Sequence, residues 1–412
     1  MRVLLIHQAF VSPSEAGGTR HFELAQAWAR RGNRFLIVAS PVSYLSGRRV
    51  KAGGREQYAG GRIEVMRAWT PSILHANFFC RVLALASFML TSLVRGLSCG
   101  RLDLVLGTSP SLFQAASAWL VAALRRKPLL LEIRDLWPDF AIDMGVVTNP
   151  LLIKSARALE SFLYRRADHI VVNSPAYREI LIGDKGVPQD KISLVPNGVD
   201  PEMFDPELDG RGMRAELGVA PDDFLVTYAG AMGPANDLGV VLEAARLLGG
   251  RPGIKLLLAG SGKDRPALEA KAARLGLENL IFAGPYPKSF MPRVLAASDA
   301  CLAILKDIPM FRTTYPNKVF DYLAAGRPVV LAIDGVIREV VDRAGAGVFV
   351  PPGDAQALAA AIEELATDPA KAREMGRRGR ALVLKHFDRR NQAKRFITLL
   401  EELAGGRGAE AA

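Results

Sequence analysis

Short apolar runs alternate along the chain with segments in which apolar residues recur every three to four positions. The apolar runs predict strands near 2–8, 34–40, 63–68, 103–107, 129–133, 168–173 and 192–195. The segments between them predict helices near 19–31, 77–98, 111–126, 151–166 and 175–183. Strands that alternate with helices in this way are typical of a parallel sheet covered by helices.

The same pattern starts again after VPNGVDPEMFDPELDG, a connector rich in proline, glycine and aspartate. Six further strands, beginning with DFLVTYAG and ending with GVFVPPGD, each precede a helical segment, and helical patterns at 370–386 and 389–404 close the chain. We therefore predict an α/β protein with two doubly wound, Rossmann-like domains. They span residues 1–200 and 201–387, and a helix and tail follow at 388–412. Such sheets bind ligands at the carboxyl ends of their strands, so we expect two edges that face each other across a deep cleft.

Composition narrows the possible partners. Half of the 412 residues are hydrophobic, and the net charge of +11 favours phosphates, nucleotides or an acidic membrane surface. Cys80, Cys99 and Cys301 show neither metal-ligand spacing nor a disulfide framework. The opening residues MRVLLIHQAF have the pattern of a strand and not of a secretory signal, which favours a cytoplasmic location.

The most membrane-like stretch is RVLALASFMLTSLVR, residues 81–95. Its thirteen uncharged residues between two arginines are fewer than the roughly 20 that a spanning helix needs. It is either a buried core helix or a helix that lies at a membrane surface. The segment 47–62, rich in glycine and arginine, is expected to be a mobile basic loop.

Candidate ligand-binding residues in the first half lie where strands end. Gly17 and Gly18 precede a helix, so backbone N–H groups there can approach a phosphate, and Arg20 adds positive charge. A glycine turn with a Thr19 cap explains the same residues without a ligand. The segment does not match GxGxxG, and no acid ends the next strand, so a dinucleotide fingerprint is poorly supported.

A second candidate is LLLEIRDLWPDFAIDMG, residues 129–145, in which an apolar strand runs into Glu132, Arg134 and Asp135. Charges at this end of a central strand point into the expected cleft. Asp135 is the better candidate for contact with a reacting hydroxyl, because Arg134 would help to keep it ionised. An Arg–Asp pair that closes a loop is the alternative.

The third candidate is the short helix in PNKVFDYLAAGRPVV. Asn317 and Lys318 begin it after Pro316, so N–H groups and an ammonium converge where an anion could bind. Asp321, one turn further on, could accept two hydrogen bonds from the diol of a ribose, or could simply complement the helix dipole. The strand end FAGPYP, with Tyr286, could read the edge of a nucleobase.

Together these segments resemble retaining glycosyltransferases of the GT-B architecture, family 4 (group 1). They are similar in particular to the bacterial O-antigen, capsule and exopolysaccharide branch that includes fucosamine transferases. The resemblance covers essentially the whole chain. It rests on GGTRHFELAQAWARRG, GTSPSLF, LEIRDLWPD, ADHIVVNSP, VPNGVD, PNKVFDYLAAGRPVV and GVFVPPGD. It implies that the last helix crosses back onto the first domain.

The resemblance also implies the reaction. A sugar would pass from a nucleotide-sugar donor, expected to be a UDP-sugar, to a polyprenyl-diphosphate-linked or saccharide acceptor with retention, in surface polysaccharide biosynthesis. In the E-x7-E motif of the family, Asp321 corresponds to the second acid and would bind ribose. Thr313 replaces the first acid, which suits a deoxy or N-acetylated donor sugar.

A second departure concerns the diphosphate. Many family members carry an Arg and a Lys where this chain has Ala231 and Asn236, so Lys318, helped by Arg312 or Arg20, would carry the phosphate charge. No metal or other cofactor is expected, because the basic side chain and helix N-termini would stabilise the leaving diphosphate. Asp135 is the expected catalytic residue, and Glu132 and Arg134 lie on the acceptor side. The expected donor-binding residues are Gly17, Gly18, Arg20, Asn236, Tyr286, Thr313, Pro316, Asn317, Lys318 and Asp321.

Two other functions fit the sequence less well. A UDP-N-acetyl sugar 2-epimerase of the same architecture needs acids and a histidine around the sugar, and His7 and His21 are the histidines near an inferred site. A non-catalytic protein that binds anionic surfaces is permitted by the charge. Nucleic acid is not an expected partner, because the basic residues are dispersed and aromatics are sparse. A lipid-linked acceptor would explain both the basic excess and the apolar helix, with peripheral attachment at the inner face of the cell membrane.

Overall fold

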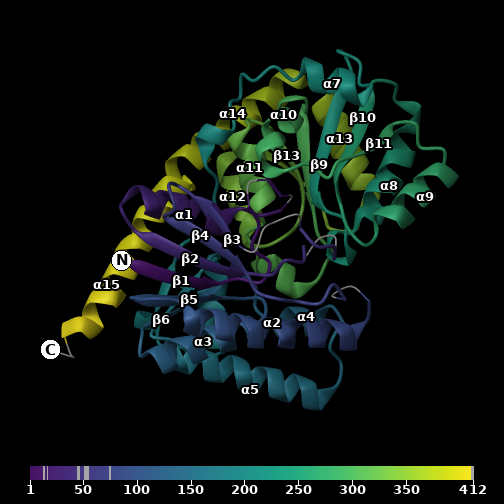
Figure 1. Ribbon diagram of the computed structural model, residues 1–412. Coiled ribbons are helices and arrows are strands. Elements are labelled where there is room, and N and C mark those ends of the chain that lie inside the picture. Colours follow the sequence, from purple (N-terminus) through teal and green to yellow (C-terminus); the bar gives the residue numbers. More distant parts are fainter. Residues whose placement is uncertain (13, 16, 44–46, 51–54, 74–75, 410–412) are drawn as a thin grey trace. The chain divides into compact units, whose positions relative to one another are not determined.

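The computed structural model describes residues 1–12, 14–15, 17–43, 47–50, 55–73 and 76–409, and the chain divides into two compact units (Figure 1). The first unit consists of Met1–Phe10, Thr19–Pro196 and the C-terminal segment from Arg390. The second consists of Val11–Gly18 and Asn197–Arg389.

The first unit is built on a sheet of eight strands among the described residues, in the order β3-β4-β2-β1-β5-β6-β7-β8. All neighbours in it are parallel except β3 and β4. The seven strands that the apolar runs predict are confirmed. The strands are β1 (Arg2–Ile6), β2 (Arg34–Ala39), β3 (Arg55–Tyr58), β4 (Ile63–Arg67), β5 (Leu104–Thr108), β6 (Leu129–Ile133), β7 (His169–Val172) and β8 (Ile192–Leu194).

The edge strand β3 corrects the prediction of a loop over 47–62. Its four residues, REQY, pair with β4 in antiparallel register, and their exposed or half-exposed side chains give no apolar signal. An edge strand pairs with a neighbouring strand on one side only and faces solvent on the other, so its sequence can be polar. The part of the predicted loop at 51–54 lies outside the described residues.

Six helices and a long C-terminal helix accompany this sheet within the described part of the first unit. They are α1 (Arg20–Arg30), α2 (Phe78–Ser98), α3 (Leu112–Arg125), α4 (Asp139–Asp143), α5 (Pro150–Arg166), α6 (Pro175–Gly183) and α15 (Arg389–Ala409). The short helix α4 was not predicted. The expected return of the last helix is confirmed, because Phe396 of α15 stacks on Trp28 with ring centroids 5.1 Å apart.

The second unit has a six-stranded parallel sheet in the order β11-β10-β9-β12-β13-β14. Successive strands of the chain are added outward on one side from β9 to β11 and on the other side from β12 to β14, so the direction reverses between β9 and β12, as in doubly wound nucleotide-binding folds. The strands are β9 (Phe224–Ala231), β10 (Ile254–Ser261), β11 (Leu280–Ala283), β12 (Ala300–Ile304), β13 (Val329–Ala332) and β14 (Gly347–Phe349).

Helices cover both faces of this second sheet, and each face has its own apolar core. The helices on one face are α8 (Leu238–Leu247), α9 (Arg265–Arg274) and α13 (Ala355–Thr367). Those on the other are α7 (Arg211–Leu217), α10 (Met291–Ala296), α11 (Asn317–Ala324) and α12 (Val336–Ala344), and α14 (Pro369–His386) contributes side chains to both cores. The two Rossmann-like sheets confirm the predicted fold class.

Candidate active site

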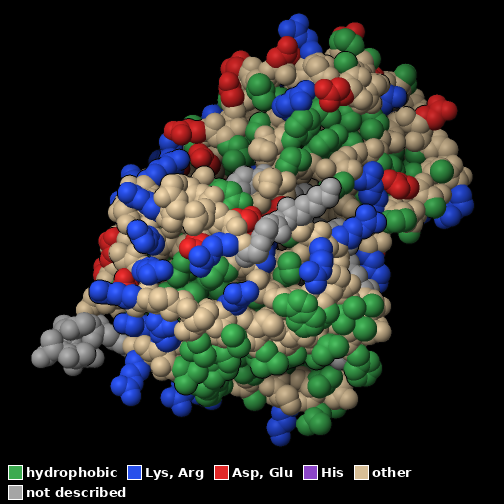
Figure 2. Space-filling view, viewed as in Figure 1, with side chains coloured by type: hydrophobic (Ala, Val, Ile, Leu, Met, Phe, Trp, Pro, Cys, Tyr) green, Lys and Arg blue, Asp and Glu red, His purple; other side chains and the backbone are tan. Residues whose placement is uncertain are grey.

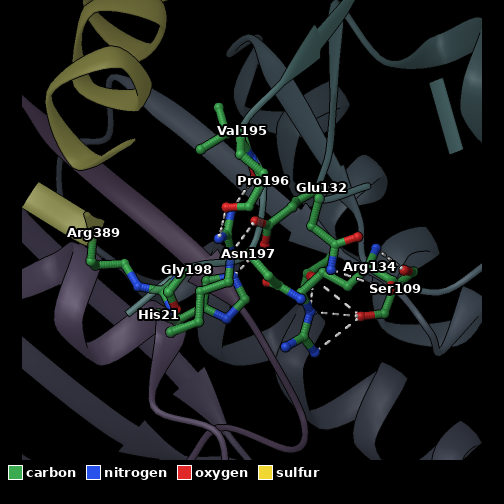
Figure 3. A network of polar contacts seen from close by, with 12 residues as sticks. His21, Ser109, Glu132, Arg134, Val195, Pro196, Asn197, Gly198 and Arg389 are labelled. Carbon is green, nitrogen blue, oxygen red and sulfur yellow. Dashed lines mark hydrogen bonds and ion pairs between the residues drawn. The ribbon is translucent and has the colours of Figure 1, made fainter. Parts of the chain in front are cut away.

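Glu132, the fourth residue of β6, is the centre of a buried polar cluster in the first unit (Figure 3). Arg20 Nε donates to one carboxylate oxygen at 2.9 Å, and His21 Nε2 lies 2.6 Å from the other. Burial alone would raise the pKa of Glu132, but the charge of Arg20 and the contact with His21 hold it well below its usual range. The carboxylate is therefore ionised and wholly committed to protein partners.

This cluster corrects two expectations. Arg20 is 2% exposed and also donates to the carbonyl oxygens of Val195 and Pro196, so its guanidinium is used inside the first unit and not at a phosphate. Glu132 is 0% exposed and therefore cannot contact an acceptor. Both residues hold α1 against the carboxyl end of β6. No local sequence pattern indicates this pairing, because the partners are 112 positions apart.

Arg134 and Asp135 follow β6 and lie beside the end of β5. Arg134 Nη2 donates to His7 Nε2 at 3.0 Å, and its Nε donates to Thr108 Oγ1 at 3.0 Å. The backbone N–H of Asp135 donates to Ser109 Oγ at 3.1 Å. These bonds fix the loop that carries both charges at the sheet edge where doubly wound folds bind ligands.

The pKa of Asp135 differs in direction from the expectation. Burial raises it to about 6, although the neighbouring charge of Arg134 opposes that rise. A carboxylate with this pKa is ionised at neutral pH and is more basic than an ordinary aspartate. That property suits a group that accepts a proton from a hydroxyl.

His7 and His21 were noticed in the sequence but were given no role. Both are 2% exposed, and their rings lie 4.6 Å apart in an edge-to-face contact. Burial lowers the pKa of each, so both imidazoles are neutral at pH 7. His7 then accepts from Arg134 through Nε2, which orients the guanidinium.

In the second unit, Lys318 lies at the carboxyl end of β9. Its Nζ is 4.0 Å from the centre of the Tyr228 ring and 3.4 Å from Asn236 Oδ1. A Cβ built at Gly230 would lie 2.9 Å from that nitrogen, and the φ of Gly230 is +155°, so only glycine suits this position. The structure thus brings Lys318 and Asn236 together.

The Lys318 ammonium has no ion-pair partner among the described residues. Burial lowers the pKa of this lysine from 10.5 to about 7. An amine that is held in a partly buried place without a counter-charge is costly in the empty protein. The arrangement is therefore typical of a binding site for an anion.

Asp321 lies one turn after Lys318 on α11 and is paired. Lys288 Nζ is 2.5 Å from Asp321 Oδ2, and both side chains are less than 20% exposed. Lys288 follows FAGPYP directly in the sequence but is not among the predicted site residues. This ion pair gives Asp321 a partner that neither the ribose nor the helix-dipole interpretation included.

The remaining predicted donor residues lie around α11 or in separate loops. Pro316 precedes the helix in extended conformation, and Asn317 is its first residue. Thr313 Oγ1 donates to the Met310 carbonyl at 2.6 Å, and Tyr286 stacks on Phe290. Gly17 and Gly18 belong to the 11–18 segment that groups with the second unit.

No group of three or more histidine, cysteine, aspartate or glutamate side chains with the geometry of a metal site is found in the described ranges. The sequence likewise offers no Asp-x-Asp pair in a suitable context.

Comparison with known families assigns both halves of the chain. Residues 16–198 match the family described as "Glycosyl transferase 4-like domain". Residues 223–368 match the family described as "Glycosyl transferases group 1".

Among curated proteins, a D-inositol 3-phosphate glycosyltransferase of Nocardia farcinica is 31% identical over 63% of this chain and 58% of its own length. Another from Segniliparus rotundus is 30% identical over 53% of this chain and 49% of its own length, so the chain spans about half the length of these relatives. The putative colanic acid biosynthesis glycosyl transferase WcaI of Escherichia coli is 24% identical over 96% of this chain and 98% of its own.

Solved structures share the fold. Sucrose-phosphate synthase from Thermosynechococcus elongatus superposes with a TM-score of 0.79 at 20% identity, covering 98% of this chain and 99% of that chain. Anabaena HepE in complex with UDP-glucose gives a TM-score of 0.73 at 19% identity, covering 98% of this chain and 100% of that chain. These similarities show the GT-B fold. They do not extend to the branch that includes fucosamine transferases.

Proposed function

Because the chain consists of a glycosyl transferase 4-like domain followed by a group 1 glycosyl transferase domain, we propose that it is a glycosyltransferase of surface polysaccharide biosynthesis. It moves a sugar from a UDP-linked donor to a lipid-linked or saccharide acceptor, with retention of the anomeric configuration. The relative WcaI, which matches over nearly its whole length, carries a name from colanic acid biosynthesis, and this supports the proposed pathway class.

The single observation that carries the proposal is Lys318. Its amine lies at the carboxyl end of β9, beside the reversal of strand order, without a counter-charge in the described residues. A nucleoside diphosphate supplies the missing negative charge. When the bond to the sugar breaks, charge on the leaving diphosphate grows, and a lysine already held in place stabilises it without a metal ion.

Asp321 binds the ribose in this proposal. A carboxylate offers about four lone-pair directions, so a bond from Lys288 leaves acceptor capacity for sugar hydroxyls. Thr313 takes the place of the acid that many relatives use for the donor sugar, and we infer a deoxy or N-acetylated sugar from its small size.

Asp135 of the first unit acts on the acceptor. Its pKa of about 6 allows it to accept hydrogen bonds and to take up a proton from the attacking hydroxyl. Arg134, oriented by His7 and Thr108, supplies positive charge beside it.

A membrane surface holds the acceptor. The 21-residue helix α2 is long and apolar enough to cross a membrane by length and composition. However, Ala84, Phe88 and Ser92 on one of its faces are fully buried, so α2 is part of the first unit's packing. Its buried Ser92 hydroxyl lies 2.8 Å from that of Ser117 in α3.

The opposite face of α2 is exposed and apolar. Leu83, Leu90 and Val94 are 57%, 58% and 66% exposed, and Figure 2 shows hydrophobic side chains gathered over this helix. Arg81 and Arg95 are exposed near its two ends. An apolar stripe between basic residues suits a helix that lies in the interface of an anionic membrane, where a polyprenyl diphosphate resides.

The test is a screen of nucleotide sugars for thermal stabilisation, followed by incubation of each hit with polyprenyl-diphosphate-linked acceptors. Mass spectrometry identifies a product, NMR of the new linkage reports retention, and EDTA tests independence from metal. Lys318→Met is the matched variant and should lose stabilisation by every nucleotide sugar. Absence of binding to any nucleotide sugar contradicts the proposal. Conversion of UDP-N-acetylglucosamine without acceptor would instead identify a 2-epimerase.

A further inference from the structure

The ion pair between Lys288 and Asp321 joins two elements that are distant in sequence. Lys288 starts a short 3-10 turn after β11, and Asp321 is the fifth residue of α11. The Lys288 ammonium also lies 5.2 Å from the centre of the Phe204 ring. The lysine side chain is 12% exposed and the aspartate side chain is 18% exposed.

Burial at this level distinguishes the pair from an ordinary surface salt bridge. Exposed pairs contribute little, because water screens them and long side chains lose entropy. A pair with little exposure costs desolvation energy for both ions and is a poor means of gaining stability. Its benefit is geometric, because each charge restricts the position of the other.

We propose that Lys288 is a positioning residue that gives the nucleotide site its preference for ribose over deoxyribose. The proposal rests on the proposed function, in which Asp321 accepts hydrogen bonds from the ribose hydroxyls. Lys288 bonds to Oδ2 of Asp321 and fixes the carboxylate in one orientation, so that its remaining lone pairs point in constant directions. Without the ammonium, the carboxylate can turn, and a ribose no longer gains more than a deoxyribose.

Two other interpretations of the pair make different predictions. If Lys288 only ties the loop after β11 to α11, its loss lowers stability and leaves the preference for ribose unchanged. If Lys288 blocks the place of the ribose, its loss strengthens the binding of every ribonucleotide. The positioning role alone predicts a selective loss of affinity for the ribose form.

The experiment compares UDP with 2′,3′-dideoxy-UDP by calorimetry, using the full chain. Wild type should prefer UDP by roughly tenfold or more, as expected for two bonds to a charged acceptor. Lys288→Met should reduce that preference to about threefold or less, whereas Lys288→Arg should restore most of it. Lys271→Met, which removes an exposed lysine of α9, is the matched control and should keep the wild-type preference.

A double variant supplies the independent check. If Lys288 acts through Asp321, Lys288→Met should change the preference in the wild-type background and not in an Asp321→Ala background. An unchanged preference in folded Lys288→Met, or tighter binding of UDP by it, overturns the inference. Wild type that binds neither nucleotide overturns the proposed function itself, so the two failures are distinguishable.

Discussion

Donor affinity should depend on pH through Lys318, because this lysine carries a proton in the complex and only partly in the empty protein. With a pKa of about 7, about half of the empty molecules have the ammonium form at pH 7, and roughly 3% have it at pH 8.5. A diphosphate in contact with the amine raises its pKa again. Binding therefore takes up a proton, and the affinity should fall by about 15-fold between pH 7 and 8.5.

UDP-glucose is the suitable probe, because its two phosphates have no proton to gain or lose in this range. Calorimetry at pH 7 in two buffers of different ionisation enthalpy should reveal uptake of about half a proton per complex. Lys318→Met should bind weakly at every pH, and its empty form should be more stable than that of wild type at pH 7, because the buried amine is gone. Wild-type affinity that does not change from pH 7 to 8.5 would refute the reasoning, and so would an equal slope in Lys318→Met.

Three other predictions concern Asp135, Asp321 and the exposed face of α2. Asp135→Asn should lower kcat by about 100-fold with unchanged donor affinity, and wild-type activity should fall as the pH drops below about 6; normal turnover of the folded variant excludes Asp135 from the mechanism. Asp321→Ala should weaken UDP by at least about tenfold and leave 2′,3′-dideoxy-UDP nearly unaffected. Replacing Leu83, Leu90 and Val94 by serine should reduce cosedimentation with anionic vesicles, and equal cosedimentation of wild type and variant would remove α2 from the membrane contact.

Much of the fold was predictable because its signals are local. Most buried strands of both sheets are dominated by apolar residues, because buried parallel strands need no polar alternation. The edge strand β3 and the short helix α4 were not predicted, because REQY and DFAID bury little apolar surface and so lack a local apolar pattern. Their conformations depend on neighbours that are distant in sequence.

The site was less predictable, because burial and pairing decide the role of a charge. Arg20 and Glu132 have the sequence context of ligand contacts, yet they bind each other inside the first unit. Desolvation raises the pKa of Asp135 and the charge of Arg134 lowers it. Which effect is larger depends on how deeply Asp135 is buried, and the sequence does not give that. The missing clamp residue drew attention to Lys318 as a replacement charge, and its role stays a prediction, whereas nothing in the sequence pointed to Lys288 as the partner of Asp321.

The return of α15 to the first unit has a consequence for synthesis on the ribosome. Trp28 stacks on Phe396, which is translated more than three hundred residues later. The indole ring also lies against that of Phe35, with ring centroids 4.3 Å apart, but its Nε1 donates to the carbonyl of Ala393. The polar atom of Trp28 and one of its ring contacts therefore form only after α15 has been translated. The first unit therefore completes its core only after the second has been translated. A chimera in which the second unit is exchanged between relatives should accordingly keep each α15 with the amino-terminal segment on which it packs.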